Sequence, residues 1–331
     1  MLDRGGARAL SQFTSSEGQL RYAIIGGTGL IGRAVATALR ARNDDVVIVS
    51  RTPGPGRVQW DPMKGLRRPT ELDGCEVVFN FSGAPMAARP WTKGRRKVLH
   101  DSRVKATEAL LASLEELDAP PRVFIGTSNL GLFGDRGDHR ITDDAPPAGG
   151  FLSDLCVAWE HAHLGAESLG SRVAVLRMSV VLSPYGGAFP LMVRPFHYIG
   201  GWLGNGQQYT PWISVRDCVG ALLHLADNER STGVYNGTVP EPTRNREWLG
   251  ALGRVMGVPV VTHAPKWALR GAFGELADEI FLASVRAVPT RLLAEGYQFV
   301  DTDAEATFRW MVTQLEAVEK GPTRSLPPHR R

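Results

Sequence analysis

The sequence predicts an α/β protein built on a doubly wound parallel sheet, with a smaller C-terminal lobe for a substrate. Two observations support this fold class. From residue 21 to residue 182, short β-branched segments alternate with segments of helical period. The first apolar segment also runs directly into a glycine turn and then a helix, and the turn reads Gly26-Gly27-Thr28-Gly29-Leu30-Ile31-Gly32. Strand, glycine turn and helix in this order are typical of a dinucleotide-binding site.

Each glycine of the turn has a physical role in such a site. Gly26 permits the tight turn, Gly29 lets the backbone approach a pyrophosphate, and Gly32 lets the helix lie close to the strand. The N-terminus of that helix favours anions and would face the phosphates.

The other helices and strands of the sheet domain are predicted from the spacing of apolar residues and from the positions of glycine and proline. Pro53-Gly54-Pro55-Gly56 excludes a helix after the second strand. We expect helices at 30–42, 92–117 and 152–169, and strands at 45–50, 58–60, 76–81, 123–126 and 173–177.

The predicted organisation is one Rossmann-type domain with an interleaved second lobe. Residues 21–182 are expected to form the dinucleotide-binding domain, to which 209–236 also contribute, whereas 183–208 and 237–318 form the substrate lobe and a C-terminal module. Residues 1–20 are expected to be a disordered leader and 319–331 a loose tail.

Composition argues against several functional classes. The net charge of +4 is small for 331 residues and its arginines and lysines are dispersed, which disfavours nucleic-acid binding. No apolar stretch is long enough for a membrane span, so we expect a cytoplasmic protein. Cys75, Cys156 and Cys218 lack metal-ligand or disulfide spacing, and His161 and His163, two residues apart in a helix, are interpreted as surface residues rather than metal ligands.

The end of the second strand predicts which dinucleotide binds. NAD-selective sites place a carboxylate there, whereas NADP-selective sites place an arginine near the 2′-phosphate. Here the strand ends in Ser50-Arg51, while Asp44 and Asp45 precede it. We therefore predict NADP(H), with Arg51 on the 2′-phosphate and Ser50 as a hydroxyl donor; the alternative is that Arg51 is an ordinary surface arginine.

With these elements assembled, the chain resembles the extended short-chain dehydrogenase/reductases, in particular the atypical, nucleoside-diphosphate-sugar epimerase-like branch called "epimerase family protein". The residues that carry the resemblance span nearly the whole chain. They are Gly26 to Gly32, Ser50 to Gly54, Trp60-Asp61-Pro62, Asn80 to Gly83, Trp91, Lys97, Ser102-Arg103, Thr127-Ser128, Gly131, Gly134, Leu155-Cys156, Trp159-Glu160, Leu176-Arg177, Val180 to Leu182, Gly186 to Ala188, Pro211 to Ile213, Asp217, Val288-Pro289, Arg291-Leu292, Gly296 and Phe299.

The resemblance implies where a cofactor would lie. It implies NADP(H) contacts at the glycine turn, at Ser50 and Arg51, at Phe81, Ser82 and Gly83, and at Arg103, Thr127 and Val181. It also implies a homodimer formed through two long helices, and a small-molecule substrate such as a nucleotide-sugar or another carbonyl compound.

The residues that usually perform the chemistry are absent. The superfamily uses a Tyr-x-x-x-Lys pair, in which the lysine lowers the pKa of the tyrosine so that the phenol acts as acid or base. Counting back from Trp159-Glu160, the two positions hold Leu152 and Cys156. Leucine has no proton to transfer, and a helix-borne cysteine is more often a buried small hydrophobe than an acid.

Other candidates for catalysis are scattered. Ser128 matches the serine that orients substrate carbonyls in the superfamily, but a serine that caps the turn after its strand explains it equally well. The remaining candidate proton donors are Asp135, Asp138, His139, Tyr185, His197 and Tyr209. Two hypotheses stay open: an oxidoreductase or epimerase of unusual mechanism, and a non-catalytic NADP(H)-binding sensor or scaffold.

Overall fold

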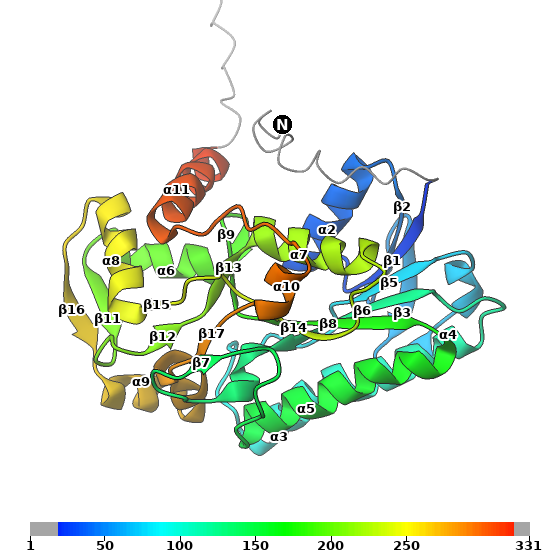
Figure 1. The fold of residues 1–331 in the computed structure, drawn as a ribbon, viewed down its shortest axis with the longest axis horizontal. Helices are drawn as coiled ribbons and strands as arrows, with labels where there is room; N and C mark the ends of the chain where they lie inside the picture. Colours follow the sequence, from blue (N-terminus) through cyan, green and yellow to red (C-terminus); the bar gives the residue numbers. More distant parts are fainter. Residues whose placement is uncertain (1–18, 321–331) are drawn as a thin grey trace, which may run out of the picture.

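The protein is centred on a large sheet, as the computed structural model of residues 19–320 shows (Figure 1). Within these residues the sheet has eight strands in the order β14-β8-β6-β5-β1-β2-β3-β4, and every neighbouring pair is parallel except β3 with β4. The strands are β1 Arg21–Ile25, β2 Asp45–Ser50, β3 Arg57–Asp61, β4 Gly65–Leu66, β5 Val77–Asn80, β6 Val123–Asn129, β8 Arg172–Met178 and β14 Gly233–Gly237. The predicted doubly wound α/β fold is confirmed.

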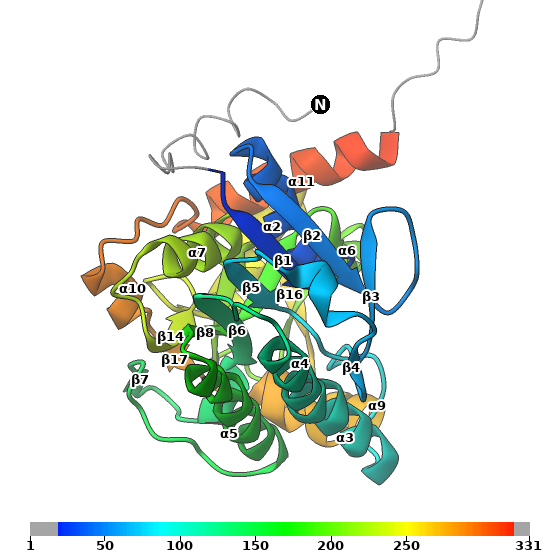
Figure 2. The same ribbon diagram turned by 90° about the vertical axis from the view of Figure 1, so that its right-hand side faces the viewer.

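Alternation along β1 explains why helices cover both faces of the sheet. Tyr22 and Ile24 pack toward α2 (Leu30–Ala41) and α7 (Val215–Asp227), whereas Ala23 and Ile25 pack toward α4 (Ala106–Glu115). Figure 2 shows α2 and α7 on one side of the sheet and α3, α4 and α5 on the other. A strand with apolar side chains on both faces needs such cover, because both sets of side chains must leave water.

Two segments that the sequence predicts as single α-helices each contain more than one type of helix. The segment expected as one helix at 92–117 consists of α3 (Lys93–His100), a π-helical turn (Asp101–Lys105) and α4. The helix expected at 152–169 is α5 (Phe151–Leu164) followed by a 3₁₀ turn (Gly165–Leu169). Apolar period alone does not reveal a π turn, because the inserted residue changes the direction of the following side chains without ending the helix.

The second lobe has its own core of aromatic side chains. Trp212, Trp248 and Phe308 are buried together there; Trp248 lies on α8 (Asn245–Met256) and Phe308 on α11 (Ala304–Lys320). Its helices are α6 Ala188–Phe196, α8 Asn245–Met256, α9 Lys266–Phe273, α10 Thr290–Ala294 and α11 Ala304–Lys320, with a π turn at Ala277–Leu282. Short strand pairs tie it together: β9 Val180–Ser183 with β10 Gly186–Gly187 and β13 Trp212–Ser214, β11 Gly200–Leu203 with β16 Val260–Ala264, β12 Tyr209–Thr210 with β15 Thr243–Arg244, and β7 Arg140–Ile141 with β17 Arg286–Ala287. Short 3₁₀ turns lie at Pro69–Leu72 and Leu130–Phe133.

The C-terminal boundary needs a correction. The sequence predicts a loose tail from residue 319, but α11 continues to Lys320, because the first helix-breaking residues of the sequence here are Gly321 and Pro322. Residues 1–18 of the expected leader and 321–331 of the expected tail lie outside the described residues. The predicted domain limits stay predictions. No helix within 19–320 combines the length and hydropathy needed to cross a membrane.

Candidate functional site

The glycine turn has the close packing that a dinucleotide site requires. Gly26 has φ +77°, a conformation that favours glycine, and its N–H donates to Val49 O at 3.1 Å. A Cβ on Gly32 would lie 2.5 Å from Gly26 O, so only glycine lets α2 start this close to β1. The first turn of α2 has neither a side-chain cap nor an acidic residue, so its N–H groups are available to an anion.

The end of β2 carries a cation and no carboxylate. Arg51 is exposed there, and Ser50 is buried beside it with its Oγ accepting from Thr52 N at 3.2 Å. Asp44 and Asp45 lie at the opposite end of the strand, where they form ion pairs with Arg42 and Arg21. The end of the strand therefore offers a cation that can bind a phosphate, and no carboxylate that could accept hydrogen bonds from ribose hydroxyls.

The end of β5 lies against the glycine turn. Phe81 N donates to Ile25 O at 3.0 Å, and a Cβ on Gly26 would contact Phe81 O at 3.0 Å. Ser82 Oγ donates to Asn80 Oδ1 at 2.6 Å, which fixes the bend after the strand. Gly83 is exposed and lies against the Arg103 guanidinium, because a Cβ on Gly83 would approach Arg103 Cζ to 3.2 Å.

Arg103 is a buried cation. Its side chain extends from the π turn, over the Trp159 ring at 5.0 Å, and donates to Ala84 O at 2.9 Å and Leu99 O at 3.3 Å. Its Nε has no hydrogen-bond partner, and no acidic side chain of residues 19–320 forms an ion pair with it. Burial lowers the pKa of Arg103 to about 10. Its only other hydrogen bond within residues 19–320 goes to Ser102 Oγ at 3.4 Å. A buried guanidinium with neutral acceptors alone retains unused capacity to bind an anion or a polar ligand.

Ser128 and Cys156 meet on the next strand and helix. Ser128, on β6, is fully buried and its Oγ has no hydrogen-bond partner among the described residues. It faces the Cys156 thiol, whose pKa is raised to about 12 by burial, with Ser128 and Arg103 acting in the opposite direction. Cys156 is therefore a protonated thiol at neutral pH.

Leu152 and Cys156, which are predicted to occupy the usual Tyr and Lys positions, both belong to the core. Leu152 is fully buried, and a Cβ on Gly131 would lie 2.2 Å from its Cδ2.

Thr127, predicted to contact a cofactor, donates to Asn80 O at 3.3 Å and joins β5 to β6. Val181 lies in β9, and the turn that follows brings Gly187 against Leu30 of the glycine turn.

Sequence reasoning missed the structural roles of two residues, Trp159 and His163. Trp159 supports the Arg103 guanidinium, and its spacing of three residues from Cys156 could have placed both on one helix face. The interpretation of His163 as a surface residue is wrong. Its ring is fully buried against Gly126, which has no side chain to exclude it, and Nε2 hydrogen-bonds Thr127 O at 3.1 Å. Burial lowers the pKa of His163 to about 3.

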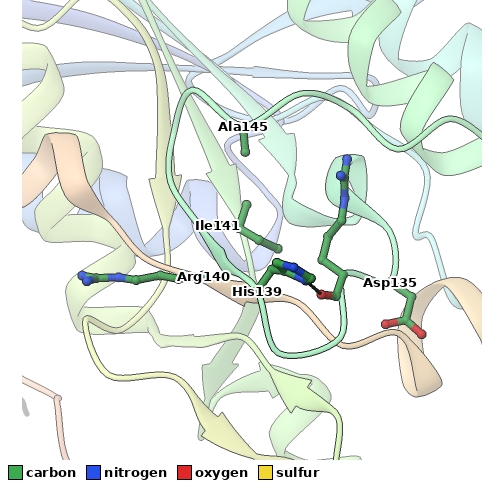
Figure 3. A pocket seen from close by; sticks show the side chains of 6 residues that line it. Asp135, His139, Arg140, Ile141 and Ala145 are labelled. Carbon is green, nitrogen blue, oxygen red and sulfur yellow. Dashed lines mark hydrogen bonds between the residues drawn. The ribbon is translucent and has the colours of Figure 1, made fainter.

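Of the other candidate proton donors, Asp135, Asp138 and Tyr185 are engaged elsewhere. Asp135 accepts from Gly137 N and Ser284 N, and Asp138 pairs with Arg244 at 3.1 Å. Tyr185 donates to Gln314 at 3.3 Å. A cavity of about 460 Å³ lies beside this loop (Figure 3) and is lined by Asp135, Arg136, His139, Arg140, Ile141 and Ala145. No group of three or more candidate metal ligands occurs in the described part of the chain.

Comparison with known proteins agrees with this geometry. The model of the NAD dependent epimerase/dehydratase family matches residues 22–236, and a domain of unknown function, DUF1731, matches 264–311. Epimerase family protein Mb2239 of Mycobacterium bovis is 40% identical over 282 residues, covering 84% of this chain and 92% of that protein.

Two solved structures show the likeness in three dimensions. Human epimerase family protein SDR39U1, crystallised with NADPH, superposes with a TM-score of 0.81 at 29% identity, covering 89% of this chain and 100% of that one. The UDP-glucose 4-epimerase of Thermotoga maritima, solved with UDP-glucose, has a TM-score of 0.70 at 18% identity, covering 90% and 99%, and shares the fold. Family model, relatives and fold agree, and the chain belongs to the NAD dependent epimerase/dehydratase family, in its "epimerase family protein" branch with a DUF1731 C-terminal domain.

Proposed function

We propose that this protein binds NADP(H) and uses it as an oxidoreductase or epimerase-like enzyme that works without the Tyr-x-x-x-Lys pair. The observation that carries the proposal is the pair of buried polar groups beside Cys156. Arg103 Nε has no hydrogen-bond partner, and Ser128 Oγ has only the weakly bonding Cys156 thiol beside it. Arg103 lies against Gly83 after β5, and Ser128 lies at the end of β6, the neighbouring strand. Buried polar atoms are normally well hydrogen-bonded, so this remaining capacity at the strand ends supports a bound ligand.

The phosphates of the cofactor fit the glycine turn. The uncapped N-terminus of α2 would hold the pyrophosphate; Gly29 would let it approach the backbone, and Gly32 lets α2 lie close to β1. Arg51 would hold the 2′-phosphate, with Ser50 beside it. The NADPH in the crystals of the human relative supports the same choice of cofactor.

The chain's own residues suggest how a carbonyl would be handled. NADP(H) supplies or accepts the hydride. Ser128 Oγ would orient the carbonyl, and the Arg103 guanidinium would stabilise negative charge on its oxygen within a site of low dielectric. Because Leu152 has no proton to transfer, the alkoxide left by hydride addition would be stabilised electrostatically and would take its proton from solvent. A nucleotide-sugar or another carbonyl compound is the substrate class that the fold's relatives support.

A second candidate function is a non-catalytic NADP(H) sensor or scaffold. It is favoured by one observation, the burial of both Leu152 and Cys156 in the core where an acid and its cation would be expected. A sensor would respond to the oxidation state of the cofactor through the differential stability of two conformations.

Cofactor identity is tested by calorimetric titration of the full chain with NADPH and NADH. NADPH is expected to bind at least ~10-fold tighter, because Arg51 pairs with the 2′-phosphate. Arg51→Ala should remove that preference. Arg40→Ala, at an exposed arginine in the last turn of α2, should leave it unchanged. Equal affinities for both cofactors in the wild type would contradict the assignment.

Catalysis is tested separately with the same protein. Carbonyl compounds and nucleotide-sugars are added to the NADPH-loaded protein, and nicotinamide absorbance and product formation are followed. Turnover that Ser128→Ala abolishes while NADPH affinity persists supports the enzyme. No turnover, combined with unequal thermal stabilisation by NADPH and NADP⁺, supports the sensor.

A further inference from the structure

Three arginines and a tyrosine line up on one face of the second lobe. They are Arg244 on β15, Tyr209 on β12, Arg286 on β17 and Arg140 on β7, and together they are called the arginine face. Neither the glycine turn nor the Arg103 site uses any of them.

Short strands hold the arginine face together. Tyr209 is the register partner of Arg244, and Arg286 is the register partner of Arg140. The two strand pairs are joined because Tyr209 N donates to Ser284 Oγ at 3.0 Å, and Val285 N donates to Tyr209 O at 3.1 Å. The backbone therefore fixes the spacing of the four side chains.

All four side chains point to the same side. The guanidinium of Arg244 lies 4.7 Å from the Tyr209 ring centroid, and that of Arg286 lies 5.0 Å from it. Arg140 shares the face of its register partner, because the next residues of both strands, Ile141 and Ala287, are buried. Figure 3 shows Arg140 extending away from His139 and Ile141.

The charge of the arginine face is only partly balanced. Arg244 pairs with Asp138 at 3.1 Å, a carboxylate that is 70% exposed. Arg286 donates to the backbone carbonyl of Asp138 at 3.3 Å, which leaves its charge uncompensated. The Arg140 side chain is exposed and makes no hydrogen bond or ion pair with any residue of 19–320. Like charges in register on neighbouring strands are destabilising, so Arg140 beside Arg286 has no structural benefit.

We propose that the arginine face binds a small polyphosphate anion, of which pyrophosphate is the simplest form. Guanidinium groups hold phosphate oxygens in bidentate pairs, and the Tyr209 ring keeps two of the three guanidiniums in place before a ligand arrives. The face consists of only four residues on a chain whose remaining charge is dispersed, so a compact anion fits it better than a nucleic-acid strand.

Calorimetric titration of the full chain with inorganic pyrophosphate, in saturating NADPH, tests the proposal. The wild type should bind pyrophosphate, and Arg140→Gln should weaken binding by ~10-fold or more. Arg140→Lys should retain part of the affinity, because it keeps the charge and loses the fork. Arg194→Gln, at an exposed arginine on α6, is the matched control and should bind like the wild type. Higher ionic strength should weaken binding.

Three outcomes would overturn the proposal. They are no binding of pyrophosphate by the wild type, equal binding by the wild type and Arg140→Gln, and tighter binding of a short single-stranded RNA than of pyrophosphate. Because the Arg140 side chain has no hydrogen bond or ion pair to lose within residues 19–320, its variants should unfold at the wild-type temperature, which keeps a loss of affinity distinct from misfolding. The NADPH titration in the same samples reports on the proposed cofactor site independently.

Discussion

Arg103 combines two properties that rarely occur together in one side chain, deep burial and the lack of an acidic partner among residues 19–320. Its hydrogen bonds go to Ala84 O, Leu99 O and Ser102 Oγ, and Trp159 supplies a π face. A buried charge without a partner costs free energy of folding, and a bound ligand that pairs with it offsets that cost. Replacement of such a residue is therefore expected to weaken the binding of the ligand. The residue therefore gives the most direct test of whether the Ser128 end of the site holds the nicotinamide half of the cofactor.

Arg103→Met should weaken NADPH binding by ~10-fold and leave the binding of adenosine 2′,5′-bisphosphate unchanged, because that compound lacks the nicotinamide half. Both affinities are measured by calorimetry. The control is Arg51→Ala, which should weaken both ligands. If Arg103→Met weakens both ligands equally, its role is to support the fold of the site rather than to contact the nicotinamide half.

At the scale of elements, the junction of β1 with α2 depends on contacts that only glycine allows. Gly32 lies so close to Gly26 O and to Gly27 Cα that a Cβ would approach them to 2.5 and 2.7 Å. The helix could accept a larger residue only by moving away from the strand, and its N-terminal N–H groups would move with it.

Gly32→Ala should reduce the free energy of unfolding by roughly 1–3 kcal/mol through overpacking, and it should abolish NADPH binding. Gly94→Ala is the matched control, because Gly94 lies inside α3 and a Cβ there would meet nothing within 4 Å. That variant should be ~1 kcal/mol more stable than the wild type, owing to helix propensity. Chemical denaturation with and without NADPH measures both. An unaffected NADPH affinity in Gly32→Ala would contradict this role of the turn.

At the scale of the whole molecule, the buried carboxylates of Asp143 and Asp217 each connect segments that are distant in the sequence. Asp143, which follows β7, accepts from Asn236 N on β14 and from Arg291 N on α10 at 3.0 Å. Asp217, on α7, accepts from Val300 N and Asp301 N, each at 2.8 Å. Each carboxylate thus satisfies backbone donors from segments that are far apart in the sequence, which couples the C-terminal module to the sheet.

Asp143→Ala should lower the free energy of unfolding by ~3 kcal/mol, because two buried backbone donors lose their acceptor. The neighbouring Asp144 is exposed, and Asp144→Ala should change the stability by less than ~0.5 kcal/mol. Urea denaturation measures both variants. Equal effects of the two substitutions would exclude the coupling role.

The buried histidine predicts how stability depends on pH. In the folded protein the pKa of His163 is about 3, below its ordinary value of 6.5, so the unfolded chain binds a proton first as the pH falls. The contribution of neutral His163 to the free energy of unfolding is fully present above pH 6.5. It is lost as the pH falls toward 3, at about 1.4 kcal/mol per pH unit. Burial also lowers the pKa of His224, which adds a loss of the same sign. Denaturation between pH ~5 and 6.5 measures the slope, which His163→Gln should reduce; a pH-independent stability would contradict it.

Local sequence is enough to establish the parallel sheet, the glycine turn and the cation at the end of β2. These features depend on residues close together in the chain, where apolar period, glycine spacing and strand ends can be read directly. It also predicts that Leu152 and Cys156 occupy the positions of the usual acid and its partner.

What surrounds those positions depends on tertiary packing. The burial of Arg103 against Trp159, the space at Gly126 that admits His163, and the pairing of β7 with β17 that places Arg140 beside Arg286 all join segments distant in sequence. Local propensity does not encode such contacts, because they depend on how elements pack rather than on how each one forms. The sequence thus predicts the cofactor fold, and packing decides which polar groups stay buried without partners and which charges gather on one face.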